Sequence, residues 1–134
     1  MESLILPRPL VNCILHQAQA SPDAEVCGLI TAKQGRPQRC IPVPNVSDQP
    51  QRLFAMDPRS QIDALRNMRE RNEELFGIYH SHPHSPAEPS DTDLDQAGYP
   101  DALYVIVSLN TKGVLEMRGF RLNHGNPEQV QLEI

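Results

Sequence analysis

Cysteine is scarce in this chain of 134 residues: there are three, and no two of them form a CxxC pair. Small domains that depend on disulfides carry many cysteines at regular spacing, and four-thiolate zinc sites need paired CxxC motifs. The sequence therefore suggests neither a disulfide framework nor a four-thiolate zinc site. We expect Cys13, Cys27 and Cys40 to be buried free thiols.

Long apolar runs and an excess of basic residues are also absent. No stretch approaches the roughly 20 apolar residues that span a bilayer, and residues 1–10 lack the basic start and apolar centre of a signal peptide. The 12 basic and 17 acidic residues give a net charge of -5, which disfavours nucleic acid or an anionic membrane as a partner. These absences predict a soluble, cytoplasmic protein.

The length suits a single domain over residues 1–134, because a chain of this size buries about two thirds of its unfolded surface. Apolar positions recur at helical spacing over residues 9–18 and predict an amphipathic helix. Asp57 as N-cap and Pro58 at the first helical position predict a second helix that ends at about residue 72. Its expected buried stripe consists of Ile62, Leu65 and Met68.

Short apolar runs predict strands that alternate with the helices. Residues 26–32 and 39–43 should form a hairpin around the turn at residues 34–37. Residues 110–113 should form the turn of another hairpin. The remaining strands are expected at residues 52–56, 75–79, 103–109, 114–122 and 130–134. This interleaving predicts an α/β or α+β fold with a mixed β-sheet flanked by helices.

Two histidines follow the apolar run at residues 75–79. Because strand side chains alternate with a period of two, His80 and His82 lie on the same side of the chain and can bind one ion together. A proline-rich, irregular segment over residues 83–89 can bring Asp93 back to them. Two histidines, one aspartate and an open fourth position are typical of a catalytic zinc site.

Each part of this pattern also has a simpler structural explanation. An isolated His-x-His pair is weak evidence for a metal, since histidines at strand ends are common. Ser90 and Asp93 have the spacing of a capping box at the start of a short helix, a role compatible with metal binding. His84 lies in the proline-rich segment and is more typical of a solvated side chain, so we leave it outside the metal shell.

The region around the histidines resembles the motif of a known family. HSHP at residues 80–83, six further residues and SDTD at residues 90–93 match the H-x-H-P-x6-S-x-x-D core of the JAMM metallopeptidases, the MPN+ or Mov34/PAD-1 type. Glu25 opens the segment EVCGLI, which is similar to the family's E-x-C-G-L-hydrophobic strand. Residues 44–45, 54–58 and 103–109 extend the resemblance over most of the chain.

The resemblance implies a fold of the MPN and cytidine deaminase type. It implies that His80, His82 and Asp93 hold zinc, that Ser90 donates a hydrogen bond to the developing oxyanion, and that Glu25 is the general acid/base. Since the sequence holds no second ligand cluster, we expect one Zn²⁺ per chain.

The resemblance also implies a function, that of a free-standing prokaryotic peptidase or isopeptidase. Such enzymes cleave the bond after the C-terminal Gly-Gly of ubiquitin-like or sulfur-carrier proteins. The segment at residues 45–53, where family members differ in substrate-binding insertions, is short. The particular substrate, the peptide, isopeptide or small-molecule amide nature of the bond, the oligomeric state and the pathway therefore stay open.

Two other functions compete with this interpretation. A non-catalytic MPN scaffold that binds partners would have lost metal ligands, whereas this ligand set is intact, and the metal content of the protein would decide between them. A zinc deaminase needs the motifs H-x-E and P-C-x-x-C, and neither occurs in the sequence.

Overall fold

The computed structural model describes residues 1–110, 115–123 and 125–134. In chain order the elements are β1 (Ser3–Ile5), α1 (Arg8–Ala20), β2 (Cys27–Lys33), β3 (Arg36–Val43), α2 (Pro58–Glu70), β4 (Glu74–His82), α3 (Asp91–Asp95), β5 (Leu103–Ser108), β6 (Glu116–Asn123) and β7 (Asn126–Glu133). No helix in the described ranges is long and apolar enough to cross a membrane.

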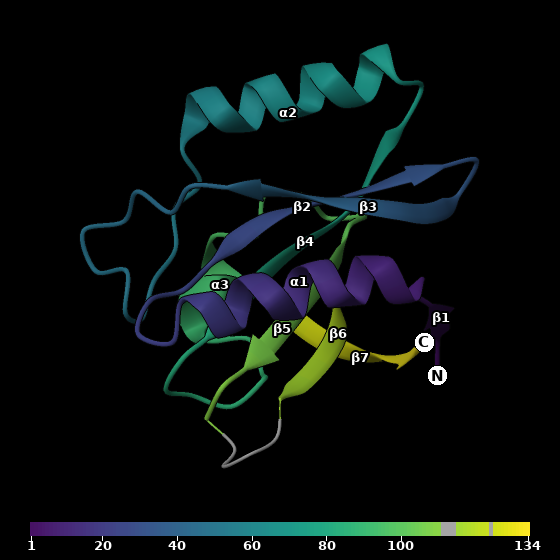
Figure 1. The fold of residues 1–134 in the computed structure, drawn as a ribbon. Coiled ribbons are helices and arrows are strands. Elements are labelled where there is room, and N and C mark those ends of the chain that lie inside the picture. Colours follow the sequence, from purple (N-terminus) through teal and green to yellow (C-terminus); the bar gives the residue numbers. More distant parts are fainter. Residues whose placement is uncertain (111–114, 124) are drawn as a thin grey trace.

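The strands form a seven-stranded sheet in the order β1-β7-β6-β5-β4-β2-β3. The pairs β4–β5 and β1–β7 are parallel and the other neighbours are antiparallel, so the sheet is mixed. Figure 1 shows α1 and α2 on opposite sides of this sheet. The predicted class, a mixed sheet flanked by helices, is confirmed.

Helix α2 begins as the sequence predicts, and two of the three predicted stripe residues, Leu65 and Met68, pack against the core. The Asp57 side chain accepts a hydrogen bond from the Ser60 backbone N–H at 3.0 Å, and Pro58 takes the first helical position. Ile62 is 56% exposed, however, and the buried residues are Ala64 and Met68. The predicted stripe is wrong at Ile62, which lies about 200° around the helix from Ala64.

The hairpin of β2 and β3 is confirmed, with Gln34 and Gly35 at its turn. Both residues have positive φ, 54° and 78°, which is the backbone geometry of a tight two-residue hairpin turn. The strand expected at residues 52–56 is wrong, because this segment makes a single bridge, Asn45 to Met56. The sequence also missed β1, which is too short to show alternation.

The hairpin predicted around residues 110–113 is confirmed by its strands. Strand β6 pairs with β5 in antiparallel register, from Tyr104 opposite Phe120 to Ser108 opposite Glu116. The predicted turn extends into residues that lie outside the described ranges, as does the first residue of the strand expected at 114–122. The last predicted strand is longer than expected, since β7 already begins at Asn126.

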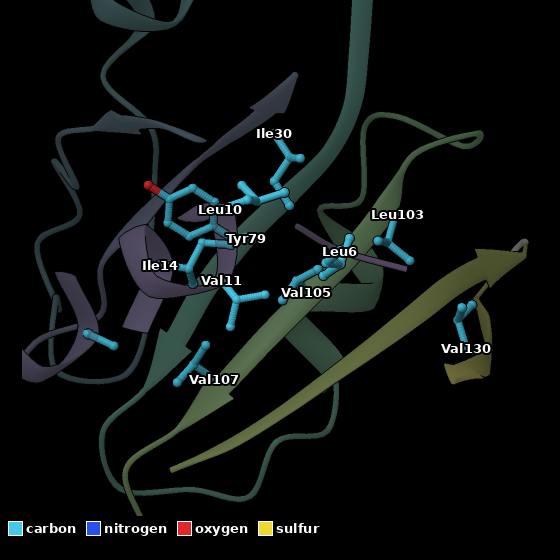
Figure 2. Packing of buried hydrophobic residues seen from close by; sticks show 11 residues of the cluster. Leu6, Leu10, Val11, Ile14, Ile30, Tyr79, Leu103, Val105, Val107 and Val130 are labelled. Carbon is cyan, nitrogen blue, oxygen red and sulfur yellow. The ribbon is translucent and has the colours of Figure 1, made fainter. Parts of the chain in front are cut away.

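Alternation along β4 gives its two faces different partners. Tyr79 faces α1 and belongs to an apolar cluster that Figure 2 shows around Leu10, Ile14 and Val105. Ile78 faces the other way, into a cluster that includes α2 residues. By the same alternation His80 and His82 project on the Ile78 side of the sheet. The α1 side of β4 is thus a structural core, whereas the opposite side carries a second apolar cluster and, at the end of the strand, the two histidines.

A disulfide joins Cys13 of α1 to Cys40 of β3. The expectation of free thiols is therefore wrong for these residues, while Cys27 is a free and buried thiol. The pair is 27 residues apart in sequence, and its Cα atoms are 6.6 Å apart because α1 packs beside β3. The spacing of the cysteines gives no sign of this contact, which depends on the packing of the helix.

Candidate metal centre

The side chains of His80 and His82 meet Asp93 at the end of β4. The Nε2 atoms of the histidines are 3.0 Å apart, and each lies 3.1 Å from Oδ2 of Asp93. Both histidines are buried, with 1% and 2% of their surface exposed. The structure therefore brings together the three side chains that the sequence proposed as ligands.

Asp93 reaches the histidines through the short helix α3. Ser90 is its N-cap: the Ser90 hydroxyl accepts from the Asp93 N–H at 3.0 Å, and Oδ2 of Asp93 accepts from the Ser90 N–H at 2.9 Å. The predicted capping box is confirmed. The same carboxylate oxygen serves the cap and faces both imidazole rings, so the two interpretations of this motif describe one arrangement.

The proline-rich segment before α3 fixes the orientation of His82. Its Nδ1 lies 2.7 Å from the carbonyl oxygen of Pro86, which can only accept a hydrogen bond. The His82 Nδ1–H therefore donates, and Nε2 of the neutral ring carries a lone pair toward the centre. Ser108 of β5 holds the segment in place by donating its hydroxyl to the carbonyl of Ser85 at 2.7 Å.

Phe54 covers His80 and was not among the predicted site residues. Its ring stacks on the imidazole with centroids 4.4 Å apart and planes inclined by 25°. Within the described part of the chain, Nδ1 of His80 has no hydrogen-bond partner. The family-like segment at residues 54–58 contained Phe54, but only the folded loop shows that it contacts a histidine.

Glu25 lies beside the histidines, just before β2 begins. It is 5% exposed, and one atom each of Glu25, His80 and His82 lie within 4.8 Å of one another. Among the described residues Oε1 of Glu25 has no hydrogen-bond partner. Burial raises the pKa of Glu25 from 4.5 to about 7; His82 acts to lower it and Asp93 to raise it. This carboxylate can therefore exchange a proton near neutral pH.

The electrostatics of the other groups favour a charged Asp93 carboxylate and a neutral His80, whereas His82 shifts the other way. Burial lowers the pKa of His80. Burial acts to raise the pKa of Asp93, but the hydrogen bonds with His80 and His82 outweigh it and hold this pKa well below its usual range. Burial acts to lower the pKa of His82, and the contacts with Asp93 and the Pro86 carbonyl turn the net shift upward.

The donor set fits a metal ion. With its Nδ1–H donated to Pro86, neutral His82 turns the lone pair of Nε2 toward Nε2 of His80 and the carboxylate oxygen of Asp93, so three potential electron-pair donors converge on one point. A cation between them would satisfy all three donors. Two imidazole nitrogens and a carboxylate oxygen are a ligand set that Zn²⁺ commonly takes in catalytic sites.

The fold is that of JAB1/MPN domains. A crystal structure of a JAB1/MPN domain protein from Archaeoglobus fulgidus superposes with a TM-score of 0.63 at 19% identity, and the match covers 98% of this chain and 99% of the other. A solution structure of a Desulfitobacterium hafniense protein gives a TM-score of 0.78 at 29% identity, covering 97% and 92%.

Residues 7–122 match the model of the family described as prokaryotic homologs of the JAB domain, and the chain belongs to this family. The CysO-cysteine peptidase of Mycobacterium tuberculosis is 35% identical over 124 residues, which are 91% of this chain and 84% of the relative. The desampylase of Haloferax volcanii is 34% identical over 95 residues, 68% of this chain and 67% of the relative. The resemblance to JAMM/MPN proteins is confirmed, and the chain is a hydrolase of this type.

Proposed function

We propose that the chain is a zinc-dependent peptidase or isopeptidase that hydrolyses the bond after the C-terminal Gly-Gly of a ubiquitin-like or sulfur-carrier protein. The observation that carries the proposal is the convergence of His80, His82 and Asp93 beside the buried Glu25, whose Oε1 has no hydrogen-bond partner among the described residues. The names of the CysO-cysteine peptidase and the desampylase support the substrate class. His80, His82 and Asp93 would hold one Zn²⁺ per chain.

Glu25 would move the proton in this reaction. Bound zinc would lower the pKa of a water molecule to about 7 and polarise the scissile carbonyl. Oε1 of Glu25, which has no hydrogen-bond partner in the described ranges, would take a proton from the attacking water and pass it to the leaving amine. A general base works best with a pKa near the operating pH, and burial raises the pKa of Glu25 to about 7.

Ser90 would stabilise the oxyanion that develops on the scissile carbonyl. Its hydroxyl oxygen already accepts a hydrogen bond from the Asp93 N–H, which leaves the hydroxyl proton free to donate. The side chain is exposed at the start of α3, so a substrate can reach it. Capping and catalysis thus use different parts of one hydroxyl group.

The C-terminal tail of the carrier would bind in extended form near residues 44–56. A cavity of about 260 Å³ lies there, with Phe54 and Met56 in its wall and Ile78 and Tyr104 also lining it. Phe54 both lines this cavity and stacks on His80, so the cavity adjoins the metal centre. A Gly-Gly tail offers mainly backbone groups, which favours recognition by hydrogen bonds along an extended segment.

Cleavage of a defined carrier tests the proposal. The zinc-loaded protein is incubated with each ubiquitin-like carrier of its own organism bearing a C-terminal extension. Mass spectrometry of the products then identifies the bond that is cleaved. We expect cleavage after Gly-Gly and no turnover of a carrier that lacks Gly-Gly. Equal cleavage of the truncated carrier would contradict the recognition mode, and a protein with neither metal nor activity would be a scaffold.

A cytoplasmic location and a single domain over residues 1–134 also stay proposals. Disulfides are rare in reducing compartments, and the Cys13–Cys40 bond makes the location testable. Alkylation of thiols in intact cells, followed by mass analysis, would show Cys13 and Cys40 reduced in the cytoplasm or oxidised elsewhere.

A further inference from the structure

The backbone, rather than the side chain, holds Glu25 in place. Within the described ranges Oε1 has no hydrogen-bond partner, whereas the Glu25 N–H donates to the Pro50 carbonyl at 2.7 Å. The Glu25 carbonyl accepts from Nδ2 of Asn45 at 3.0 Å. Glu25 precedes β2, so the sheet ladder does not fix these groups. The direction of the carboxylate therefore depends on contacts from the loop between β3 and α2.

Within this loop, the side chain of Asn45 forms hydrogen bonds both to Glu25 and to other residues of the loop. Besides the Glu25 carbonyl, Nδ2 donates to the Leu53 carbonyl at 3.0 Å. Its Oδ1 accepts from the N–H groups of Ser47 and Ala55, each at 3.0 Å. Both donors and both acceptor positions of the amide are thus used. One side chain ties both ends of residues 47–55 to each other and to Glu25.

The same contacts also place an aromatic ring against the metal centre. Phe54 lies between Leu53 and Ala55, which Asn45 holds on both sides, and its ring stacks on His80. No other side chain of this length supplies two donors and an acceptor: aspartate only accepts, and serine donates once.

We propose that Asn45 is a positioning residue that aligns Glu25 with the centre and couples this alignment to the loop at residues 47–55. The inference rests on the proposed function, since it assigns Asn45 an effect on the general base. Asn45 acts through Glu25, so its loss slows the chemical step while the metal ligands stay in place. A misplacement of about 1 Å in such a group can reduce the rate about 100-fold.

The variant Asn45→Asp tests the donor function of the amide separately from its acceptor function. It keeps the size and the acceptor oxygens for Ser47 and Ala55, and it removes the donors to the carbonyls of Glu25 and Leu53. Arg121→Ala is the matched control, because it deletes three hydrogen bonds, to Glu2 and the Asp101 carbonyl, on strand β6. We expect Asn45→Asp to keep its zinc and to lose about 10- to 100-fold in kcat. The control should keep its kcat.

A double-mutant comparison distinguishes positioning from a general structural role. If Asn45 acts through Glu25, Asn45→Asp slows the wild-type enzyme but adds less than about twofold to the loss in Glu25→Gln. A purely structural role predicts the same fold-change in both backgrounds, and that result would overturn the inference. Asn45→Ser serves the same comparison if the aspartate variant does not fold.

Hydrogen exchange tests the inference without turnover. The Glu25 amide, bonded to Pro50, should exchange at least about tenfold faster in metal-free Asn45→Asp than in the metal-free wild type or Arg121→Ala. Unchanged exchange would refute the positioning role. If the wild type cleaves no carrier, the proposed function fails, and the exchange rates still decide whether Asn45 fixes Glu25.

Discussion

The histidines and the carboxylates of the centre are placed by different kinds of structure. His80 and His82 belong to β4, which pairs with β2 on one side and β5 on the other. Glu25 precedes a strand, and Asp93 lies in the short helix α3, so hydrogen bonds between side chains and backbone position both carboxylates. The sheet thus makes one half of the centre rigid, and local loop contacts align the other half. Substitutions in the two halves should fail in different ways.

The largest loss of activity is expected from substitutions of the histidines, which lie on a strand of the sheet. His82→Ala removes one of three converging donors and should abolish both zinc binding and activity. The matched control is His84→Ala, which changes an exposed histidine of the neighbouring loop and should retain one zinc per chain. Metal content after thorough dialysis is the measurement. Stoichiometric zinc in His82→Ala would remove this residue from the ligand set.

Among the carboxylates, which loop contacts position, Glu25→Gln should lower turnover while zinc stays bound. Amide and carboxyl groups are nearly isosteric, and the lost proton transfer typically costs about 10²- to 10⁴-fold in rate. Zinc content, melting temperature and turnover are measured on one preparation. Near-normal turnover with zinc bound would show that Glu25 takes no part in the mechanism, and loss of zinc would make it a ligand.

Ser90→Ala tests whether α3 contributes more than the position of Asp93. Losing an oxyanion donor should lower kcat by about 10²- to 10³-fold, and losing the cap should cost about 1 kcal/mol of stability. Glycine is tolerated at an N-cap, so Ser90→Gly should recover most of the stability but none of the rate. If the rate recovers together with the melting temperature, Ser90 serves only as a cap.

The disulfide lies outside both halves and should affect stability alone. Replacing Cys13 and Cys40 together by serine should lower the free energy of unfolding by about 2 to 4 kcal/mol, because the unfolded chain gains entropy. Denaturant titration with and without a reductant measures this cost. Turnover of the folded variant should match the wild type, and a large loss of kcat would show that the bond also shapes the centre.

The smallest effect concerns the metal-free protein and its pH dependence. Folding raises the pKa of Glu25 from 4.5 to about 7, so the folded state binds this proton more tightly than the unfolded state. Stability from this group is therefore present below about pH 4.5 and is lost as pH rises to about 7. Relative to Glu25→Gln, the wild type should lose on the order of 2 to 3 kcal/mol between pH 5 and 8. A pH-independent difference between the two would argue against the raised pKa.

Much of the fold and part of the centre can be predicted from local patterns. The alternation of β4 puts His80 and His82 on one side, and the spacing of Ser90 and Asp93 gives the capping box. These features depend on residues a few positions apart, so the sequence contains their cause. The role of Glu25 came from the family resemblance alone, since nothing near it in sequence reveals its distance from the histidines.

By itself, the sequence determined the order of the main elements, the mixed sheet and the side chains of the candidate metal centre, because periodicity, caps and turns act over short stretches. Tertiary structure decided the contacts between distant segments. The bond between Cys13 and Cys40 spans 27 residues, Asn45 contacts Glu25 from 20 residues away, and Phe54, in the same loop as Asn45, stacks on His80. Each contact exists only where packed elements meet, and the burial that raises the pKa of Glu25 likewise arises only in the folded chain.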